Sequence, residues 1–400
     1  MNKETLRKAK QILLTLERNG HAAFFVGGCV RDQFLKKDIG DIDITTSASP
    51  TEVQSTFDKV IPVGIEHGTV IVRLEGESFE VTTFRVDGDY SDFRHPDHVR
   101  FVDRIDDDLA RRDFTMNAIA MDANGKIVDP FMGERDIQNR VIRTVGSAPL
   151  RFQEDPLRMM RALRFASQLG FTIEEETYKA LLENVLLIDK IAMERITVEM
   201  EKLFKGSNLN CGLTLFKEIR MAEYIPILKE NPNIVDHLTT QTVPLHNMSE
   251  VIVLFHFFEP TISVTRWMKE WKLSNQTKNE ANKLIDLLNI FLEYGMSSWL
   301  VYNLPEQLQG SLIRLLDACY DRKITDDHLF QIRSELSIKN RSEIVMNGQD
   351  IAETFEKREK GPWINTSLVA LEKAIVNQEV ANNKKDLREW LKQWSQLETD

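Results

Sequence analysis

The pattern of apolar residues changes near Pro149. Before this point, helical stretches alternate with short apolar runs typical of strands, which cover residues 22–26, 41–45, 69–74, 79–84, 118–122 and 127–129. Beyond it, the spacing of apolar residues is helical almost to the C-terminus, as in residues 157–169 and 278–291. The sequence therefore predicts an α+β fold, with a small mixed sheet in an N-terminal head followed by an all-α remainder.

The chain of 400 residues is longer than one ordinary hydrophobic core supports, so we expect several domains. The change near Pro149 separates the head from helical parts that we call neck, body and tail. The predicted boundaries are 1–145 for the head, 146–206 for the neck, 207–320 for the body and 321–400 for the tail.

The net charge of −11 counts against a chain that binds nucleic acid over its whole surface, because Lys and Arg dominate contacts to phosphate. Net charge does not report where charges lie. Arginine recurs densely between Arg85 and Arg164, so a local basic face on an acidic protein is compatible with the composition.

The sequence favours a cytoplasmic location. Its most apolar stretches, such as residues 252–258, are much shorter than the roughly 20 residues that cross a bilayer. The N-terminus begins with charged amphipathic residues instead of the apolar block of a signal peptide. Three widely spaced cysteines form neither a disulfide framework nor a zinc pattern, as expected in a reducing compartment.

The sharpest motif is Gly27-Gly28-Cys29-Val30-Arg31-Asp32, which directly follows a predicted strand. Two glycines that enter a helix let backbone amides approach phosphate oxygens, and Arg31 adds a charged donor. A tight turn between a strand and a helix produces the same pattern. On the first interpretation, Gly28 and Arg31 bind a nucleotide.

Asp41 and Asp43 lie two residues apart in a predicted strand, so both carboxylates point to one face. A divalent cation such as Mg²⁺ relieves the repulsion between two such acids through oxygen ligands. Paired metals align a 3′-hydroxyl for attack on an α-phosphate. Asp41 and Asp43 are therefore candidate catalytic and metal-binding residues, with a solvated strand edge as the alternative.

The segment Glu154-Asp155-Pro156-Leu157-Arg158 is the most informative about specificity. Asp155 and Arg158 lie three apart at the start of a helix, and Arg161 and Arg164 continue the row. A carboxylate can accept from the exocyclic amino group of cytosine or adenine while a guanidinium donates to the adjacent ring nitrogen. Uracil and guanine present the reverse pattern. The alternative is an ordinary surface ion pair.

Together with Arg111-Arg112-Asp113-Phe114-Thr115-Met116-Asn117, these motifs resemble the nucleotidyltransferase superfamily of DNA polymerase β type. Within it, the chain is similar to bacterial class II CCA-adding enzymes and poly(A) polymerases. The resemblance covers the first half of the chain. It implies a catalytic head that uses Mg²⁺, a neck that reads the nucleobase, and a body and tail that bind tRNA.

In residues, the resemblance implies nucleotide binding by Gly28, Arg31, Arg112, Asp155, Arg158, Arg161 and Arg164. Asp113 and Asn117 match positions near the ribose. Residues 85–99, with Tyr90, Asp92, Arg94, His95 and Pro96, resemble the loop that switches specificity from C to A. Residues 129–137 resemble a hinge, and the block that begins at Met193 resembles a helix supporting the nucleotide site. Glu80 is an open candidate for a third carboxylate.

The expected activity is addition of CMP, CMP and AMP from CTP and ATP to the 3′ end of tRNA, with no obligate protein partner. One alternative is a poly(A) polymerase, against which residues 64–70 (GIEHGTV) lack a basic stretch. A second is an enzyme that adds only CC or only A. A third, outside the enzymes, is an inactive RNA-binding derivative, which the presence of Asp41, Asp43 and Arg158 disfavours.

Overall fold

The computed structural model describes residues 3–88, 90, 93, 98–238, 243–356 and 358–397. It consists of two compact units. Unit 1 comprises Met1–Pro244 with Glu270–Lys272, and unit 2 comprises Leu245–Lys269 with Leu273–Asp400. Among the described helices, none combines the length and apolar character needed to cross a lipid bilayer.

Unit 1 contains all the strands named in the described chain and helices α1 to α11. The strands are β1 (Ala23–Val26), β2 (Asp43–Thr46), β3 (Val60–Gly64), β4 (Thr69–Leu74), β5 (Glu77–Thr83), β6 (Arg85–Asp87), β7 (Val99–Phe101), β8 (Ala120–Met121), β9 (Ile127–Val128), β10 (Val141–Ile142) and β11 (Thr172–Ile173). The helices are α1 (Lys3–Arg18), α2 (Gly28–Phe34), α3 (Pro50–Thr56), α4 (Ile105–Ala110), α5 (Gly133–Asn139), α6 (Ala148–Glu154), α7 (Leu157–Leu169), α8 (Glu175–Asn184), α9 (Met193–Phe204), α10 (Leu209–Glu218) and α11 (Pro232–Leu238).

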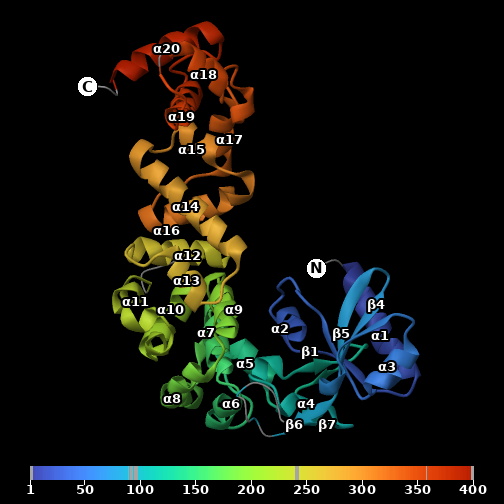
Figure 1. Ribbon diagram of the computed structural model, residues 1–400. Helices are drawn as coiled ribbons and strands as arrows, with labels where there is room; N and C mark the ends of the chain where they lie inside the picture. The colour runs from blue at the N-terminus through green and yellow to red at the C-terminus, as the bar shows by residue number, and fades with distance from the viewer. Residues whose placement is uncertain are drawn as a thin grey trace. The chain divides into compact units, whose positions relative to one another are not determined.

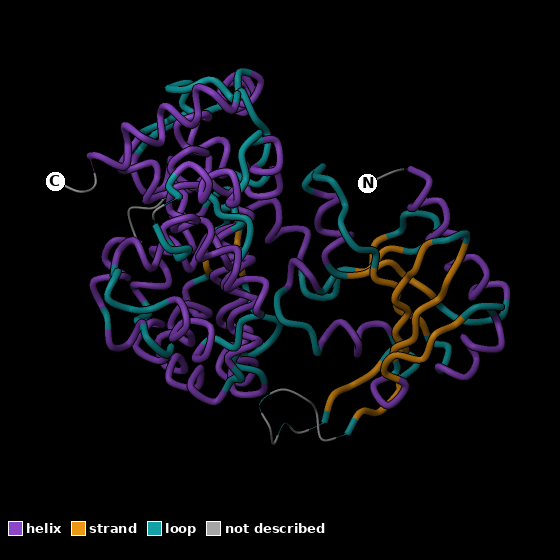
Figure 2. The backbone as a smooth tube through the Cα atoms, turned by 45° about the horizontal axis from the view of Figure 1, so that its top comes forward, coloured by secondary structure: helices purple, strands orange, loops and turns teal. Residues whose placement is uncertain are grey.

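The main sheet of unit 1 has the order β3-β4-β5-β2-β1-β8-β9 in the described residues. The neighbours β2 and β5 are parallel, whereas the other neighbouring pairs are antiparallel. Figure 2 shows the strands of this sheet in orange near the N-terminus, with helices beside them. The α+β prediction with a mixed sheet in the head is confirmed.

Alternating side chains explain how the sheet is covered. In β4, Val70 and Val72 are fully buried while their neighbours are not. In α1, Ala9, Leu13 and Leu16 are fully buried at helical spacing. Helices α1 and α3 lie side by side against the sheet, where α1 contacts β1 and α3 contacts β4 (Figure 1). The two periodicities therefore bring the apolar faces of helices and strands into one core.

Two details of the predicted strands differ in the structure. The run predicted over residues 41–45 begins as a strand at Asp43, and Asp41 lies in a bend before it. The strand β3 was not predicted, because its residues are largely exposed and Pro62 interrupts the pattern. The predicted strand runs 118–122 and 127–129 contain β8 and β9, which pair as an antiparallel hairpin with Gly125 at φ 86° in the turn.

Helix α7, which carries the row of arginines, packs against α9 and α10. Close approach is required there, because a Cβ built on Gly206 would lie 2.0 Å from the Ser167 hydroxyl oxygen. The same hydroxyl donates to the Leu203 carbonyl at 2.6 Å. Trp271 is fully buried in unit 1, where its indole N–H donates to the Pro226 carbonyl at 3.0 Å. The contacts of Ser167 hold the C-terminal end of α7 against the end of α9.

Unit 2 is helical in its described residues, with α12 (Met248–Phe258), α13 (Val264–Glu270), α14 (Asn275–Tyr294), α15 (Ser298–Asn303), α16 (Gln309–Tyr320), α17 (Asp326–Ser334), α18 (Gly348–Thr354), α19 (Trp363–Val376) and α20 (Lys384–Leu397). The end of α13 belongs to unit 1. The fully buried carboxylate of Glu250 accepts from the Arg314 guanidinium at 2.7 and 2.9 Å and from the Ser311 hydroxyl at 2.7 Å. This network ties α12 to α16.

Candidate active site

Gly27 follows the end of β1 and caps α2, with φ 76° and ψ −132°. A Cβ at this position would lie 3.3 Å from Nη1 of Arg112 and 3.9 Å from Oδ2 of Asp43. Only glycine combines this backbone conformation with such close neighbours. The turn therefore places the start of α2, at Gly28, beside both an arginine and a carboxylate.

Arg31, on α2, is buried and held by two residues. Its Nε and Nη2 donate to Oδ1 of Asp32 at 2.9 and 2.7 Å, and its Nη1 donates to Oδ1 of Asn117 at 2.7 Å. A Cβ on Gly28 would lie 3.6 Å from Nη2 of Arg31. The guanidinium thus lies beside the glycine turn, as predicted for a phosphate donor, but it is already fixed by protein partners.

Asp41, Asp43 and Glu80 line one pocket of about 320 Å³. The sheet register sets two of them side by side, because Asp43 on β2 pairs with Glu80 on β5. Burial raises the pKa of Asp43, and Asp41 adds to this effect while Arg112 opposes it. Burial also raises the pKa of Glu80, and Asp43 and Asp41 raise it further. The pocket therefore concentrates negative charge.

A divalent cation would relieve that repulsion, and carboxylate oxygens are the ligands that hard cations prefer. The donor set of Asp41 and Asp43 fits such an ion. In the part of the chain that the structure describes, no group of three or more His, Cys, Asp or Glu side chains is arranged to hold a metal. Glu80 shares the pocket with the aspartates without completing such a group.

Asp113 links the segment that follows α4 to α7. Its Oδ1 accepts from the Asn117 amide at 3.1 Å and from the Phe114 backbone N–H at 2.8 Å. Its Oδ2 accepts from the Arg161 guanidinium, with contacts of 2.6 and 2.8 Å. Burial acts to raise the pKa of Asp113, but Arg161 and Asn117 outweigh it and hold the pKa well below its usual range. Asp113 is thus bound to protein groups on both oxygens.

The chain of ion pairs continues through Glu199 on α9. Its carboxylate lies 3.1 Å from Nη1 of Arg164 and 3.9 Å from Nη1 of Arg161. Burial and the nearby Arg161 lower the pKa of Arg164 to about 10, so it keeps its charge at neutral pH. The guanidinium carbons of Arg31, Arg161 and Arg164 lie 5.2, 5.6 and 4.2 Å from the centre of the Phe165 ring. Three cations thus lie close to one aromatic ring.

Asp155 and Arg158 are not an exposed surface pair. Asp155 lies between α6 and α7 with extended backbone, and 16% of its side chain is exposed. Its Oδ1 accepts from the Leu157 backbone N–H at 3.1 Å, and its Oδ2 accepts from Nη2 of Arg195 at 2.9 Å. Arg158 is buried and donates to Glu154 at 2.7 Å. Each member of the predicted pair is therefore held by a different partner.

The hydrogen bonds of Arg158 to protein groups do not use all the N–H groups of its guanidinium. Its Nη1 donates to Glu154 and to the Arg151 carbonyl, and its Nη2 donates to the Arg111 carbonyl at 3.2 Å. A guanidinium has five N–H groups, so these bonds leave one on Nη2 and the one on Nε. The bond to the Arg111 carbonyl links Arg158 to the residue that precedes Arg112, whose guanidinium lies beside Gly27.

The predicted loop over residues 85–99 begins and ends in the short antiparallel pair β6 and β7. The Tyr90 hydroxyl donates to Asp87 at 2.8 Å, and Arg111 lies 3.6 Å from the same carboxylate. Asp92, Arg94, His95 and Pro96 lie outside the described residues. The base of the loop is therefore anchored next to Arg111.

Comparisons with known proteins agree with this geometry. The family model for the poly A polymerase head domain matches residues 23–143, one for an RNA and SrmB-binding site of polymerase A matches 170–231, and one for a tRNA nucleotidyltransferase domain 2 matches 245–391. The crystal structure of the Bacillus stearothermophilus CCA-adding enzyme in complex with CTP is 36% identical, with a TM-score of 0.87 over 100% of this chain and 99% of that one.

Relatives match at similar length. The CCA-adding enzyme of Oceanobacillus iheyensis is 45% identical over 392 residues, covering 98% of each chain, and that of Geobacillus sp. WCH70 is 40% identical over 395 residues, covering 97% of each. The chain belongs to the bacterial class II CCA-adding enzymes. The Thermotoga maritima CCA-adding enzyme complexed with tRNA, 22% identical with a TM-score of 0.63 and coverage of 98% and 96%, shares the fold.

In this CCA-adding enzyme, sequence reasoning missed residues that hold the motif arginines. Asp108 is fully buried and lies 2.9 Å from Arg111 and 3.2 Å from Arg112. The spacing of three and four residues along α4 was a usable signal. Arg195 was interpreted only as general support, and its bond to Asp155 spans 40 residues, so no local pattern pointed to it.

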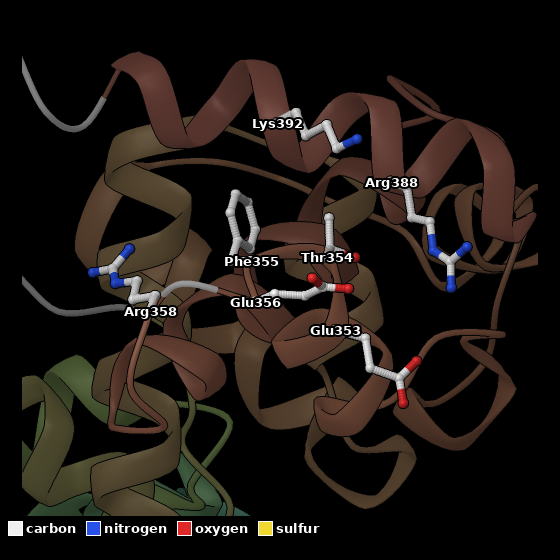
Figure 3. Close-up of a pocket in the computed structure, with 7 residues that line it drawn as sticks. All are labelled: Glu353, Thr354, Phe355, Glu356, Arg358, Arg388 and Lys392. Atoms are coloured by element: carbon white, nitrogen blue, oxygen red, sulfur yellow. The ribbon is translucent and has the colours of Figure 1, made fainter.

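Unit 2 of this CCA-adding enzyme has a separate pocket of about 920 Å³ between α18 and α20. Figure 3 shows Arg388 and Lys392 on α20 above Phe355, with Arg358 to one side and Glu353 and Glu356 below. The Arg358 guanidinium lies 4.7 Å from the centre of the Trp363 ring. Cations beside aromatic rings form a surface suited to phosphates and bases.

Proposed function

We propose that the chain adds and repairs the 3′-terminal CCA of tRNA without a nucleic-acid template, transferring CMP, CMP and AMP from CTP and ATP with release of pyrophosphate. The observation that carries this proposal is identity of 40–45% with CCA-adding enzymes over nearly the whole chain. The match to a CTP complex of such an enzyme over the full chain supports it.

We propose that Asp41 and Asp43 are the catalytic residues and that they hold Mg²⁺. Their common pocket and the raised pKa of Asp43 support this role. A bound divalent cation supplies positive charge to phosphate oxygens and activates a hydroxyl. Gly28 brings a backbone amide to the triphosphate, and Arg31 and Arg112 add positive charge on either side of the turn. Glu80 adds negative charge to the same pocket.

We propose that Asp155 and Arg158 read the base. The free oxygen lone pairs of Asp155 would accept from the exocyclic amino group, and a remaining N–H of Arg158 would donate to the ring nitrogen. Uracil or guanine would leave buried polar groups unpaired, at a cost of about 1–3 kcal/mol each. Arg161 and Arg164 complete the nucleotide site in this proposal, and their ion pairs with Asp113 and Glu199 support it.

The proposal assigns catalysis to the head (1–145), base reading to the neck (146–206), and tRNA binding to the body (207–320) and tail (321–400). The pocket with Arg358, Arg388 and Lys392 supports an RNA-binding role for the tail. We also propose a cytoplasmic location, which the three free cysteines support because their thiols suit a reducing compartment.

A poly(A) polymerase is the second candidate, because the family model for the head is named for that enzyme. The two activities, and addition of only CC or only A, are separated by one assay. The protein and Mg²⁺ are incubated with tRNA lacking its last three nucleotides, or with tRNA ending in CC, and with CTP, ATP, both, or UTP and GTP, and the 3′ ends are sequenced.

CC with CTP alone and CCA followed by arrest with both nucleotides are the expected products. A long A tail, a stop at CC, or A addition only to tRNA already ending in CC would each contradict the proposal. Asp41→Asn and Asp43→Asn should abolish product, whereas Asp236→Asn, which neutralises an exposed acid on α11, should not. Activity retained in both motif variants would remove these residues from the catalytic role.

A further inference from the structure

The carboxylate of Asp155 has two fixed neighbours, one on each oxygen. Oδ1 accepts from the Leu157 backbone N–H at the start of α7, and Oδ2 accepts from the Arg195 guanidinium at the start of α9. The contact of 2.9 Å with Arg195 is a charge-assisted bond. The orientation of Asp155 therefore depends on two helices that are separate in sequence.

Asp155 needs this second support because no helix fixes it. Helix α6 ends at Glu154, α7 begins at Leu157, and Asp155 between them has φ −140° and ψ 95°. A bond from Leu157 alone holds one oxygen and leaves the carboxyl group free to rotate about it. Arg161, the other nearby cation of α7, donates to Asp113 instead.

We infer that Arg195 is a positioning residue for base selection, which holds the Asp155 carboxylate in the orientation that accepts from the amino group of cytosine or adenine. The inference rests on the proposed base-reading function of Asp155. Arg195 does not itself contact the base in this assignment. It acts by keeping Oδ2 fixed, so that Asp155 cannot turn toward a donor placed differently, such as the ring N–H of uracil.

The position of Arg195 makes the inference testable without disturbing the core. Arg195 and Leu157 line a surface depression of about 620 Å³, and 20% of the Arg195 side chain is exposed. Lysine at this position would keep the charge but lose the planar fork that fixes an oxygen. Arg195→Lys should therefore have a smaller effect than Arg195→Met, and Arg195→Gln tests the role if the methionine variant fails to fold.

The experiment measures kcat/KM for single addition of CMP and of UMP to tRNA lacking CCA, with the full-length protein. In Arg195→Met, loss of a bond to a charged group should lower the ratio of kcat/KM for CMP addition to kcat/KM for UMP addition by about tenfold or more. The matched control is Arg220→Met, which removes an exposed arginine paired with Glu223 and should leave the ratio unchanged. In an Asp155→Asn background, Arg195→Met should lower this ratio by a further factor of less than about three.

Two results would overturn the inference in different ways. If Arg195→Met lowers kcat/KM for CTP and UTP by the same factor, Arg195 supports the fold alone and the base-reading role of Asp155 stands. If Asp155→Asn itself leaves the ratio unchanged, Asp155 does not read the base, and the inference falls together with that part of the proposed function.

Discussion

Replacing Asp113 with asparagine should destabilise unit 1 by about 2–3 kcal/mol. Asparagine keeps an oxygen for the Phe114 and Asn117 donors, but its amide nitrogen then faces the guanidinium of Arg161, so that two donors meet. Breaking a buried ion pair costs about 3–5 kcal/mol. We use a lower value because 32% of the Arg161 side chain is exposed and water replaces part of the lost interaction.

The assay is backbone hydrogen exchange measured by mass spectrometry. It detects local unfolding peptide by peptide and so distinguishes unit 1 from unit 2. Peptides from residues 113–120 and 157–169 should exchange faster in Asp113→Asn, while peptides from unit 2 should not change. The matched control is Asp236→Asn, which breaks the exposed pair with Lys217 and should leave exchange unchanged. Unchanged exchange in Asp113→Asn would refute the reasoning that this pair holds the head to the neck.

The pH dependence gives a second check on the same variant. The pKa of Asp113 is held below its usual value in the folded state, so its stabilising effect is fully present above the unfolded pKa of about 3.9. The effect is lost as the pH falls further toward the folded pKa. The difference between wild type and Asp113→Asn should be constant from about pH 5 to 8 and shrink below about pH 4. A decline that begins near pH 7 would point to another group.

Three further variants or treatments test other features. Gly27→Ala should lower the free energy of unfolding by about 1–3 kcal/mol and slow nucleotide addition, because the φ of 76° and the nearby guanidinium both exclude a Cβ. Thermal unfolding and kinetics measure the two effects. Arg314→Met should destabilise unit 2 by about 3 kcal/mol, because it leaves the buried Glu250 charge without its cation; faster exchange in residues 248–258 checks it. Iodoacetamide at pH 8 should modify the exposed Cys211 but not Cys29, because burial raises the pKa of the Cys29 thiol to about 11; peptide mass spectrometry distinguishes them.

Elements with strong periodicity could be predicted from the sequence. The strand β4 and the helix α7 have the bounds expected from the spacing of their apolar residues. The strand β3 escaped detection because it lies at the edge of the sheet, where exposed side chains carry no alternation. Apolar periodicity indicates which side of a helix or strand is buried. A strand that is exposed on both sides therefore has no such pattern to detect.

The sequence motifs nominate the residues of the candidate site but not the partners that hold them. Asp155 and Arg158 were expected to share one face at the start of a helix, and their spacing did not reveal that their side chains bond to Arg195 and Glu154. The bond between Arg31 and Asn117 spans 86 positions, and that between Asp113 and Arg161 spans 48. Local spacing cannot reveal such contacts, because they form only when segments far apart in the sequence fold together.

The separate anchoring of Asp155 and Arg158 constrains how a different base preference could arise. Exchanging the aspartate and the arginine at these two positions would place the new arginine at position 155 beside Arg195. It would place the new aspartate at position 158 beside Glu154. Each single exchange would therefore place like charges together in a largely buried site before any new base could be bound. A lineage that changed the preferred nucleotide would have to change four charged residues, through intermediates that fold less well than either end point.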